Sequence, residues 1–172
     1  MAQQDADWEM RLAALWTAVD AMEPSELLLR VDTLAAERPS GDPAALFERA
    51  CARDTTGDEQ AAEGLYRAAL ANGGLDHIRR ARATIQLAST LRILGRLDES
   101  EEMLTAELAR QDRSATTHPL HDETRAILAL TYVAQGRGTE ATGLALLALA
   151  PHLSRYNRSV AGNAAELLEP PG

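Results

Sequence analysis

Apolar residues recur at steps of three and four along most of the chain, which is the spacing of one face of an α-helix. The first stripe consists of Trp8, Leu12, Leu15, Trp16, Val19 and Met22. Pro24 then opens a second stripe, since proline is tolerated in the first turn of a helix. No segment alternates apolar and polar residues as a half-buried strand requires. The pattern predicts an all-α protein of about nine helices, at residues 8–22, 25–37, 43–54, 58–71, 76–94, 97–111, 119–135, 139–150 and 154–168.

Three segments of the chain share one pattern. Each has a glycine, a small residue five positions later and a usually large residue nine positions later, and an alanine lies seven positions before the glycine. In chain order the sets are Ala50, Gly57, Ala62 and Tyr66, then Ala88, Gly95, Ser100 and Leu104, then Ala129, Gly136, Ala141 and Ala145. The small residues at 62, 100 and 141 are 38 and 41 residues apart. We expect each glycine to end one helix, and the small residues to let that helix pack closely on the next, so that hairpins stack.

This register resembles the tetratricopeptide repeat family, most clearly in Leu87-Ala88-Ser89-Thr90-Leu91 before Gly95 and in Leu128-Ala129-Leu130-Thr131-Tyr132 before Gly136. The resemblance implies an all-α, right-handed solenoid of antiparallel helical hairpins. Its parts would be residues 1–40 as an N-terminal hairpin or cap, 41–150 as three repeats and 151–172 as a capping helix and tail. The stretched spacings are similar to those of a bacterial subgroup. A plain helical bundle would explain the apolar stripes but not the repeated glycines and small residues.

Three positions depart from the family pattern. Arg53 stands where an apolar or aromatic residue is usual, Glu107 where a small residue is usual, and Ala145 where a large one is usual. The first repeat is the weakest match as a result.

Composition narrows the classes of partner. Aromatic residues make up only 3% and alanine is abundant, which suits closely packed helices. The formal net charge of −9 argues against binding nucleic acid or an anionic membrane. The single cysteine, Cys51, excludes an internal disulfide and fits a reducing compartment. Residues 1–7 do not resemble a signal peptide, and the apolar run 144–150 is too short to cross a bilayer. We expect a cytoplasmic protein.

Patterns that would carry chemistry are weak. His118 and His121 are close in sequence, but Pro119 keeps the first outside a helix, and no other histidine or cysteine completes a metal site. The acids after His121 suit the first turn of a helix. Cys51 lacks a nucleophile signature, and Gly73 follows a helix rather than the strand that precedes a phosphate loop. We expect no catalytic residue, no cofactor and no metal.

The predicted helix 76–94 carries a candidate binding face. The resemblance implies that the first helix of each repeat lines a concave surface. By register, the residues of this helix that point there are Arg82, Ile85, Gln86, Ser89 and Arg92. Because the guanidinium fork matches a carboxylate, the expected ligand is an acidic peptide or a chain's C-terminal carboxylate. The alternative is that these arginines, with Arg79 and Arg80, pair with the protein's own glutamates.

The function favoured by the sequence is a non-catalytic protein–protein or protein–peptide interaction scaffold that uses the concave face. A peptide-responsive regulatory module is the alternative, and an enzyme is favoured least. We also expect a homodimer. Trp8 and Trp16 share one side of a helix, and large aromatics are favoured interface anchors. The competing interpretation is that both tryptophans bury against the protein's own first repeat.

Overall fold

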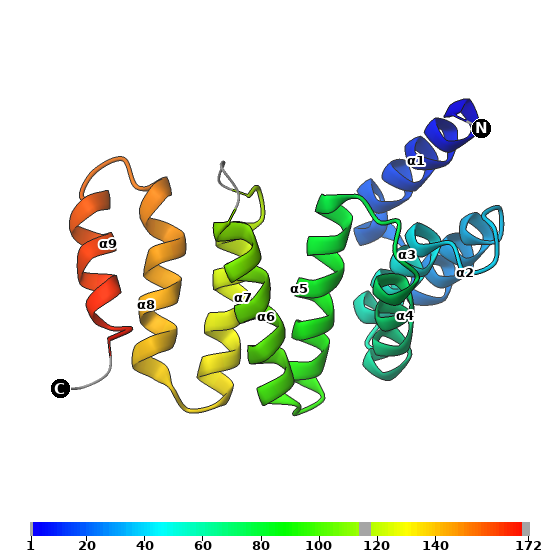
Figure 1. Cartoon of the computed structure of the whole chain (residues 1–172). Helices are drawn as coiled ribbons and strands as arrows, with labels where there is room; N and C mark the ends of the chain where they lie inside the picture. Colours follow the sequence, from blue (N-terminus) through cyan, green and yellow to red (C-terminus); the bar gives the residue numbers. More distant parts are fainter. Residues whose placement is uncertain (1, 114–117, 170–172) are drawn as a thin grey trace. The chain divides into compact units, whose positions relative to one another are not determined.

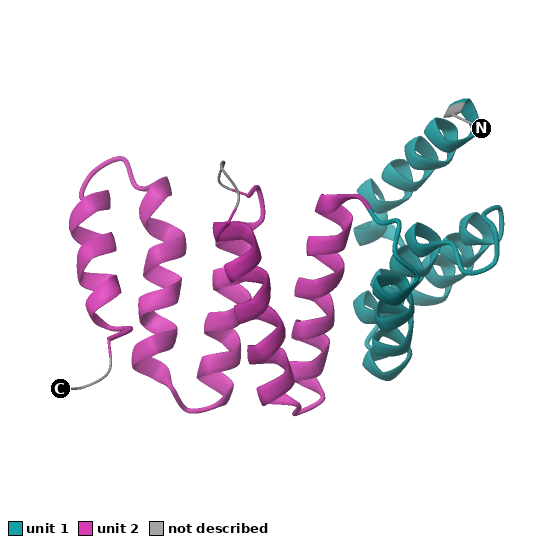
Figure 2. Cartoon of the chain, viewed as in Figure 1, with its two compact units in different colours: residues 1–75 teal, residues 76–172 magenta. Residues whose placement is uncertain are grey.

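The computed structural model describes residues 2–113 and 118–169, and within these ranges the regular structure is helical throughout (Figure 1). The predicted tail at 170–172 lies outside the described residues. The chain forms two compact units, residues 1–75 and 76–172, which Figure 2 colours separately. The division places the first predicted repeat in unit 1 and the other two in unit 2.

Unit 1 contains four α-helices within its described residues. They are α1 (Ala2–Thr17), α2 (Pro24–Ala35), α3 (Pro43–Thr55) and α4 (Glu59–Asn72), with a 3-10 turn at Val19–Ala21 between the first two. Helices α3 and α4 form a hairpin, and α2 packs against α3. Asp42 and Asp58 cap the two hairpin helices, because each carboxylate accepts a hydrogen bond from the backbone N–H three residues later.

Unit 2 continues with five α-helices in its described part. They are α5 (His77–Ile93), α6 (Leu97–Asp112), α7 (His121–Ala134), α8 (Gly138–Leu149) and α9 (Asn157–Glu166), with a 3-10 turn at Ala150–His152 before the last. Helices α5 and α6 form one hairpin and α7 and α8 the next (Figure 1). Helix α7 packs against both helices of the preceding hairpin, and α9 packs against α8. The predicted all-α architecture of about nine helices, arranged in packed hairpins, is confirmed for the described residues.

The glycines of the three repeats all end a helix in the same way. Gly57, Gly95 and Gly136 have φ angles of 80°, 79° and 79°, in the left-handed region that glycine adopts without steric cost. The residue after each glycine donates its backbone N–H to the carbonyl five residues earlier, at 2.9, 2.8 and 2.8 Å. These bonds satisfy carbonyls that the helix end leaves unpaired, as in a Schellman motif. The predicted helix stops are confirmed.

The small positions of the repeat are buried contact points between helices. All six are buried: Ala50, Ala62, Ala88, Ser100, Ala129 and Ala141. Ser100 also forms a hydrogen bond with Thr131 of the next repeat, with 2.9 Å between the hydroxyl oxygens. The departure at Arg53 has an explanation in unit 1, since Arg53 donates two hydrogen bonds to Asp32 of α2, at 2.8 and 2.6 Å.

Two helix starts differ from their predicted positions by three residues or more. Helix α1 begins at Ala2 instead of Trp8, because residues 2–7 are good helix formers that carry no apolar stripe. Helix α9 begins at Asn157 instead of 154, because Tyr156 adopts a left-handed conformation (φ 65°) directly before it.

The tryptophans of α1 pack within unit 1, where Trp8 is buried and Trp16 is partly buried. Trp8 is a core residue and donates its indole N–H to the Leu34 carbonyl at 2.8 Å. Trp16 packs on the same core and donates to the buried Glu48 carboxylate at 2.8 Å. The structure therefore favours the interpretation that both tryptophans bury against their own unit, and neither is presented as an interface anchor.

Candidate functional site

The predicted binding residues of α5 divide into surface and core. Arg82 is exposed, while Gln86, Ser89 and Arg92 are half-buried. Ile85 does not belong to the surface group. Only 6% of its surface is exposed, and it packs in the core of unit 2 with Leu104 and Leu128. The reason is that both α6 and α7 pack against α5, so the buried face of this helix is broader than the repeat register suggests.

The arginines of α5 differ in their carboxylate partners. Arg80 donates to the Glu107 carboxylate at 2.7 Å, and Arg79 lies 3.8 Å from the Asp76 carboxylate. For these two, pairing with the protein's own acids is the observed arrangement. Arg92 differs, because among the described residues it has no carboxylate partner.

The surroundings of Arg92 satisfy few of the hydrogen-bond donors of its guanidinium. Its one hydrogen bond within the described chain is a long one, 3.4 Å to the Ser89 hydroxyl. Its Nε is shielded from solvent and has no hydrogen-bond partner among the residues that the structure describes. A charge that is partly desolvated and unpaired interacts strongly with any carboxylate that reaches its outer nitrogens.

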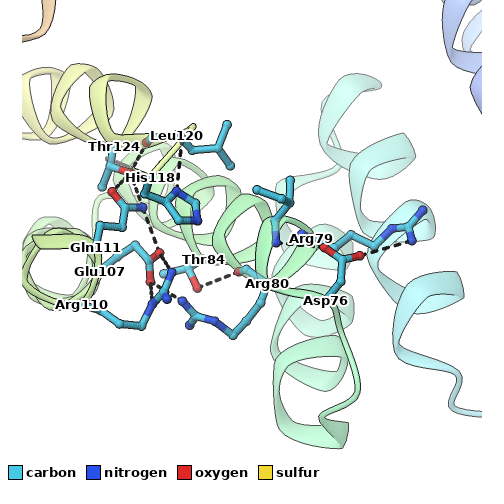
Figure 3. A network of polar contacts seen from close by, with 11 residues as sticks. Asp76, Arg79, Arg80, Thr84, Glu107, Arg110, Gln111, His118, Leu120 and Thr124 are labelled. Carbon is cyan, nitrogen blue, oxygen red and sulfur yellow. Dashed lines mark hydrogen bonds and ion pairs between the residues drawn. The ribbon is translucent and has the colours of Figure 1, made fainter. Parts of the chain in front are cut away.

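The departure at Glu107 is explained by a polar network between α5, α6 and α7 (Figure 3). The buried Glu107 carboxylate accepts hydrogen bonds from Arg80, Arg110 and Gln111, and Gln111 also donates to the Thr124 hydroxyl at 3.1 Å. Burial raises the pKa of Glu107, but the hydrogen bonds from Arg110, Arg80 and Gln111 outweigh burial, so the net pKa lies below the usual glutamate value. The network joins three helices and is internally paired, which fits a structural role.

The two histidines singled out in the sequence make separate contacts. His118 is buried, and its Nδ1 accepts the backbone N–H of Leu120 at 3.2 Å. Burial and the nearby Arg110 lower the pKa of His118. His121 lies at the start of α7 and contacts the Asp112 carboxylate through Nε2 at 2.8 Å. Across residues 2–113 and 118–169, no three His, Cys, Asp or Glu side chains are grouped so that they could hold a metal ion.

Cys51 and a hollow in unit 1 are two further places that could carry chemistry. Cys51 is buried beside the Tyr66 hydroxyl at 3.5 Å, and burial raises the pKa of Tyr66. The hollow, about 590 Å³, is lined partly by Asp32 and Arg49. Asp32 already accepts hydrogen bonds from Arg53 and Arg49, which lower its pKa. The charged groups that line the hollow are thus paired with each other rather than directed at a ligand.

An apolar surface that the sequence did not predict lies on α7. Leu130 and Val133 are 48% and 61% exposed. They occupy the same repeat positions as Ser89 and Arg92 of α5, one and four residues after the small alanine of each helix. Between α7 and α8 they line a groove of about 430 Å³. The departure at Ala145, which also lines this groove, was its sequence signal.

Comparisons with known proteins address the family. In the described part of the chain, no helix is both long and apolar enough to cross a membrane. No curated protein matches the sequence. The fold is similar to that in the crystal structure of a variant of a Podosopora anserina protein that carries the name kinesin light chain and has nearly identical TPR-like repeats. That match has a TM-score of 0.69 and 22% sequence identity and covers 93% of this chain and 82% of the other. The family model described as "Tetratrico peptide repeat" matches residues 43–167. The chain therefore belongs to the tetratricopeptide repeat family, whose members generally act as protein-interaction scaffolds.

Proposed function

We propose that this protein is a non-catalytic scaffold that binds a partner protein or peptide on the surface formed by α5 and α7. This surface, called here the α5–α7 face, consists of Gln86, Ser89, Arg92, Leu130 and Val133. Ser89 and Arg92 of α5 occupy the same repeat positions as Leu130 and Val133 of α7, and the two helices pack side by side in unit 2. The family supports the general role of protein binding, and the side chains of this face support the place.

The observation that carries the proposal is the unpaired guanidinium of Arg92. The protein is acidic, with a formal net charge of −9, and its half-buried arginines such as Arg53 and Arg80 have carboxylate partners. Arg92 is half-buried without one in the described structure. An arginine held this way offers a carboxylate a charge-assisted hydrogen bond at little further desolvation cost.

The ligand that fits Arg92 is an acidic side chain or the C-terminal carboxylate of a partner chain. The Ser89 hydroxyl and the Gln86 amide lie on the same helix face and would supply neutral hydrogen bonds beside the charge. A small, polar and partly charged contact of this kind sets the orientation of an extended peptide more than its total affinity.

The test uses peptides selected from a random display library on the full-length chain, with affinities measured by fluorescence anisotropy. Arg92→Ala should weaken binding roughly ten-fold, because a hydrogen bond to a charged group is lost. The matched control is Arg158→Ala, which removes an exposed arginine of α9. Unchanged affinity in Arg92→Ala, with the helical circular dichroism signal intact in both variants, would place binding on another surface.

We propose in addition that the protein is cytoplasmic and forms a homodimer. The single cysteine, Cys51, supports a reducing compartment. The tryptophans no longer support the dimer, but Met10 and Leu29 in unit 1 do, since they are 65% and 68% exposed. Light scattering at tens of micromolar protein should give the mass of two chains, and a monomer mass would rule the dimer out.

A further inference from the structure

The third repeat lacks a large side chain that the other two repeats bury. Tyr66 in the first repeat and Leu104 in the second have no exposed surface. The third repeat has Ala145 at this position, and Ala145 is exposed. Packed helices usually leave no void as large as a leucine or tyrosine side chain. A repeat that lacks this side chain must therefore either bring its helices closer together or keep an open groove.

The structure shows an open groove. Its lining comes from two helices, with Ala126, Ala129, Leu130 and Val133 on α7 and Gly138, Ala141, Thr142 and Ala145 on α8. The next helix, α9, does not fill the space, because it packs against α8 and makes at most marginal contact with α7. By contrast, α7 packs against both α5 and α6 in the preceding repeat.

The groove is suited to one kind of chemical group. Thr142 is its one polar side chain, and that hydroxyl already donates to the Gly138 carbonyl at 2.8 Å. No charged side chain lines it among the described residues. An apolar group would therefore be buried without leaving a polar atom unsatisfied, whereas a polar group would find no partner.

We propose that this groove binds a large apolar side chain, of the size of leucine or tyrosine, from a partner peptide that also has an acidic group on Arg92. The partner takes the place of the side chain that Ala145 does not provide. The identification of the occupant as a peptide rests on the proposed function.

Two observations favour an acidic peptide over a second copy of this chain. Leu130 and Val133 occupy the same repeat positions on α7 as Ser89 and Arg92 on the adjacent α5, so the groove continues the α5–α7 face. A peptide that crosses this face meets the unpaired positive charge of Arg92 and then the groove. The exposed apolar side chains that support the homodimer, Met10 and Leu29, belong to unit 1, whereas the groove lies in unit 2.

The groove can be tested without knowing the partner. The probe is p-cresol, which reproduces the tyrosine side chain, titrated into the ¹⁵N-labelled full-length chain. We expect saturable shifts in the amide signals of Gly138, Ala141, Thr142 and Ala145. Ala145→Leu supplies the missing side chain and should abolish these shifts, while Ala106→Leu makes the same change at an exposed position of α6 and should leave them. Shifts that are absent, lie elsewhere or survive in Ala145→Leu would overturn the groove.

The affinities of selected peptides for two variants distinguish a failure of the groove from a failure of the proposed function. Selected peptides should contain a large apolar residue near an acidic one, and they should bind Ala145→Leu roughly ten-fold more weakly, because burial of one large side chain is lost. If Arg92→Ala weakens peptide binding but Ala145→Leu does not, the groove does not bind the peptide and the proposed function still holds. Peptides weakened by Ala145→Leu but not by Arg92→Ala would keep the groove and overturn the role of the arginine. A library that yields no binder to the wild-type chain would contradict both.

Discussion

The second and third repeats of this protein share the same backbone turn but differ in how completely the space between their helices is filled. Both helix pairs turn at a glycine with φ of 79°, and both place a buried small residue five positions later. In the second repeat Leu104 then fills the space between the helices completely. In the third repeat Ala145 leaves it open beside the exposed Leu130 and Val133. The repeat register therefore determines where the helices turn. Single side chains then determine whether a repeat is fully packed or presents an open surface.

The largest expected effect comes from exchanging the two side chains that differ. Leu104→Ala should lower the free energy of unfolding by about 2–5 kcal/mol, because it creates a cavity in a fully packed site. Ala145→Leu adds the same side chain to an open groove and should leave stability unchanged or slightly higher. Thermal unfolding of both variants checks the contrast. Equal destabilisation by the two changes would mean that the groove is not open in solution.

A smaller effect is expected at the small positions that the repeats share. Ala88→Leu should cost about 1–3 kcal/mol, because the added atoms must displace neighbours in a close helix contact. Ala129→Leu should cost less, because Ala129 lines the open groove and the added atoms can extend into it. Glu102→Gln on the exposed surface of α6 is the reference and should change stability by less than about 0.5 kcal/mol. A harmless Ala88→Leu would contradict the register.

The polar network of the second repeat should make its stability depend on pH. The pKa of Glu107 is lowered in the folded state, so its stabilising contribution is present above the usual glutamate pKa and is lost as the pH falls through the folded value. Glu107→Gln should cost roughly 1–2 kcal/mol at pH 7, since Arg80 and Arg110 are one-third exposed and solvent screens them.

Denaturant unfolding between pH 3 and pH 7 measures this difference. The gap between wild type and Glu107→Gln should narrow as the pH falls below the usual glutamate pKa and through the lower folded value, because Glu107 then becomes protonated. A gap that stays constant across this range would show that the carboxylate charge does not stabilise the fold.

The smallest expected effect concerns the ion pairs after the third repeat's glycine. Arg137 donates to Glu101 at 2.7 Å and to Glu140 at 2.6 Å, and its guanidinium lies 3.7 Å from the centre of the Tyr132 ring. Arg137→Lys keeps the charge but loses the fork and the stacking, and should cost less than about 1 kcal/mol. Arg155→Lys, at an exposed position, is the control in the same denaturant titration.

The fold was predictable from the sequence because its signals are local. The glycines at 57, 95 and 136 and the apolar stripes depend on the chain's own neighbours, and the helices they predicted are present. The site was only partly predictable. Ile85 was assigned to a surface, yet it is buried because two further helices pack on α5. Within the described structure Arg92 has no carboxylate partner, which depends on where distant acids lie, and residue spacing does not encode that. Ala145 was recognised as a departure, but its exposure also depends on the position of α9.

The most direct test of the account is chemical-shift mapping of a selected peptide on the ¹⁵N-labelled full-length chain. We predict that the perturbed amides cluster on α5 and α7 around Ser89, Arg92, Leu130 and Val133, and extend to Ala145 of α8. Perturbations confined to unit 1, or to the surface of α6 that carries Glu102 and Ala106, would contradict it.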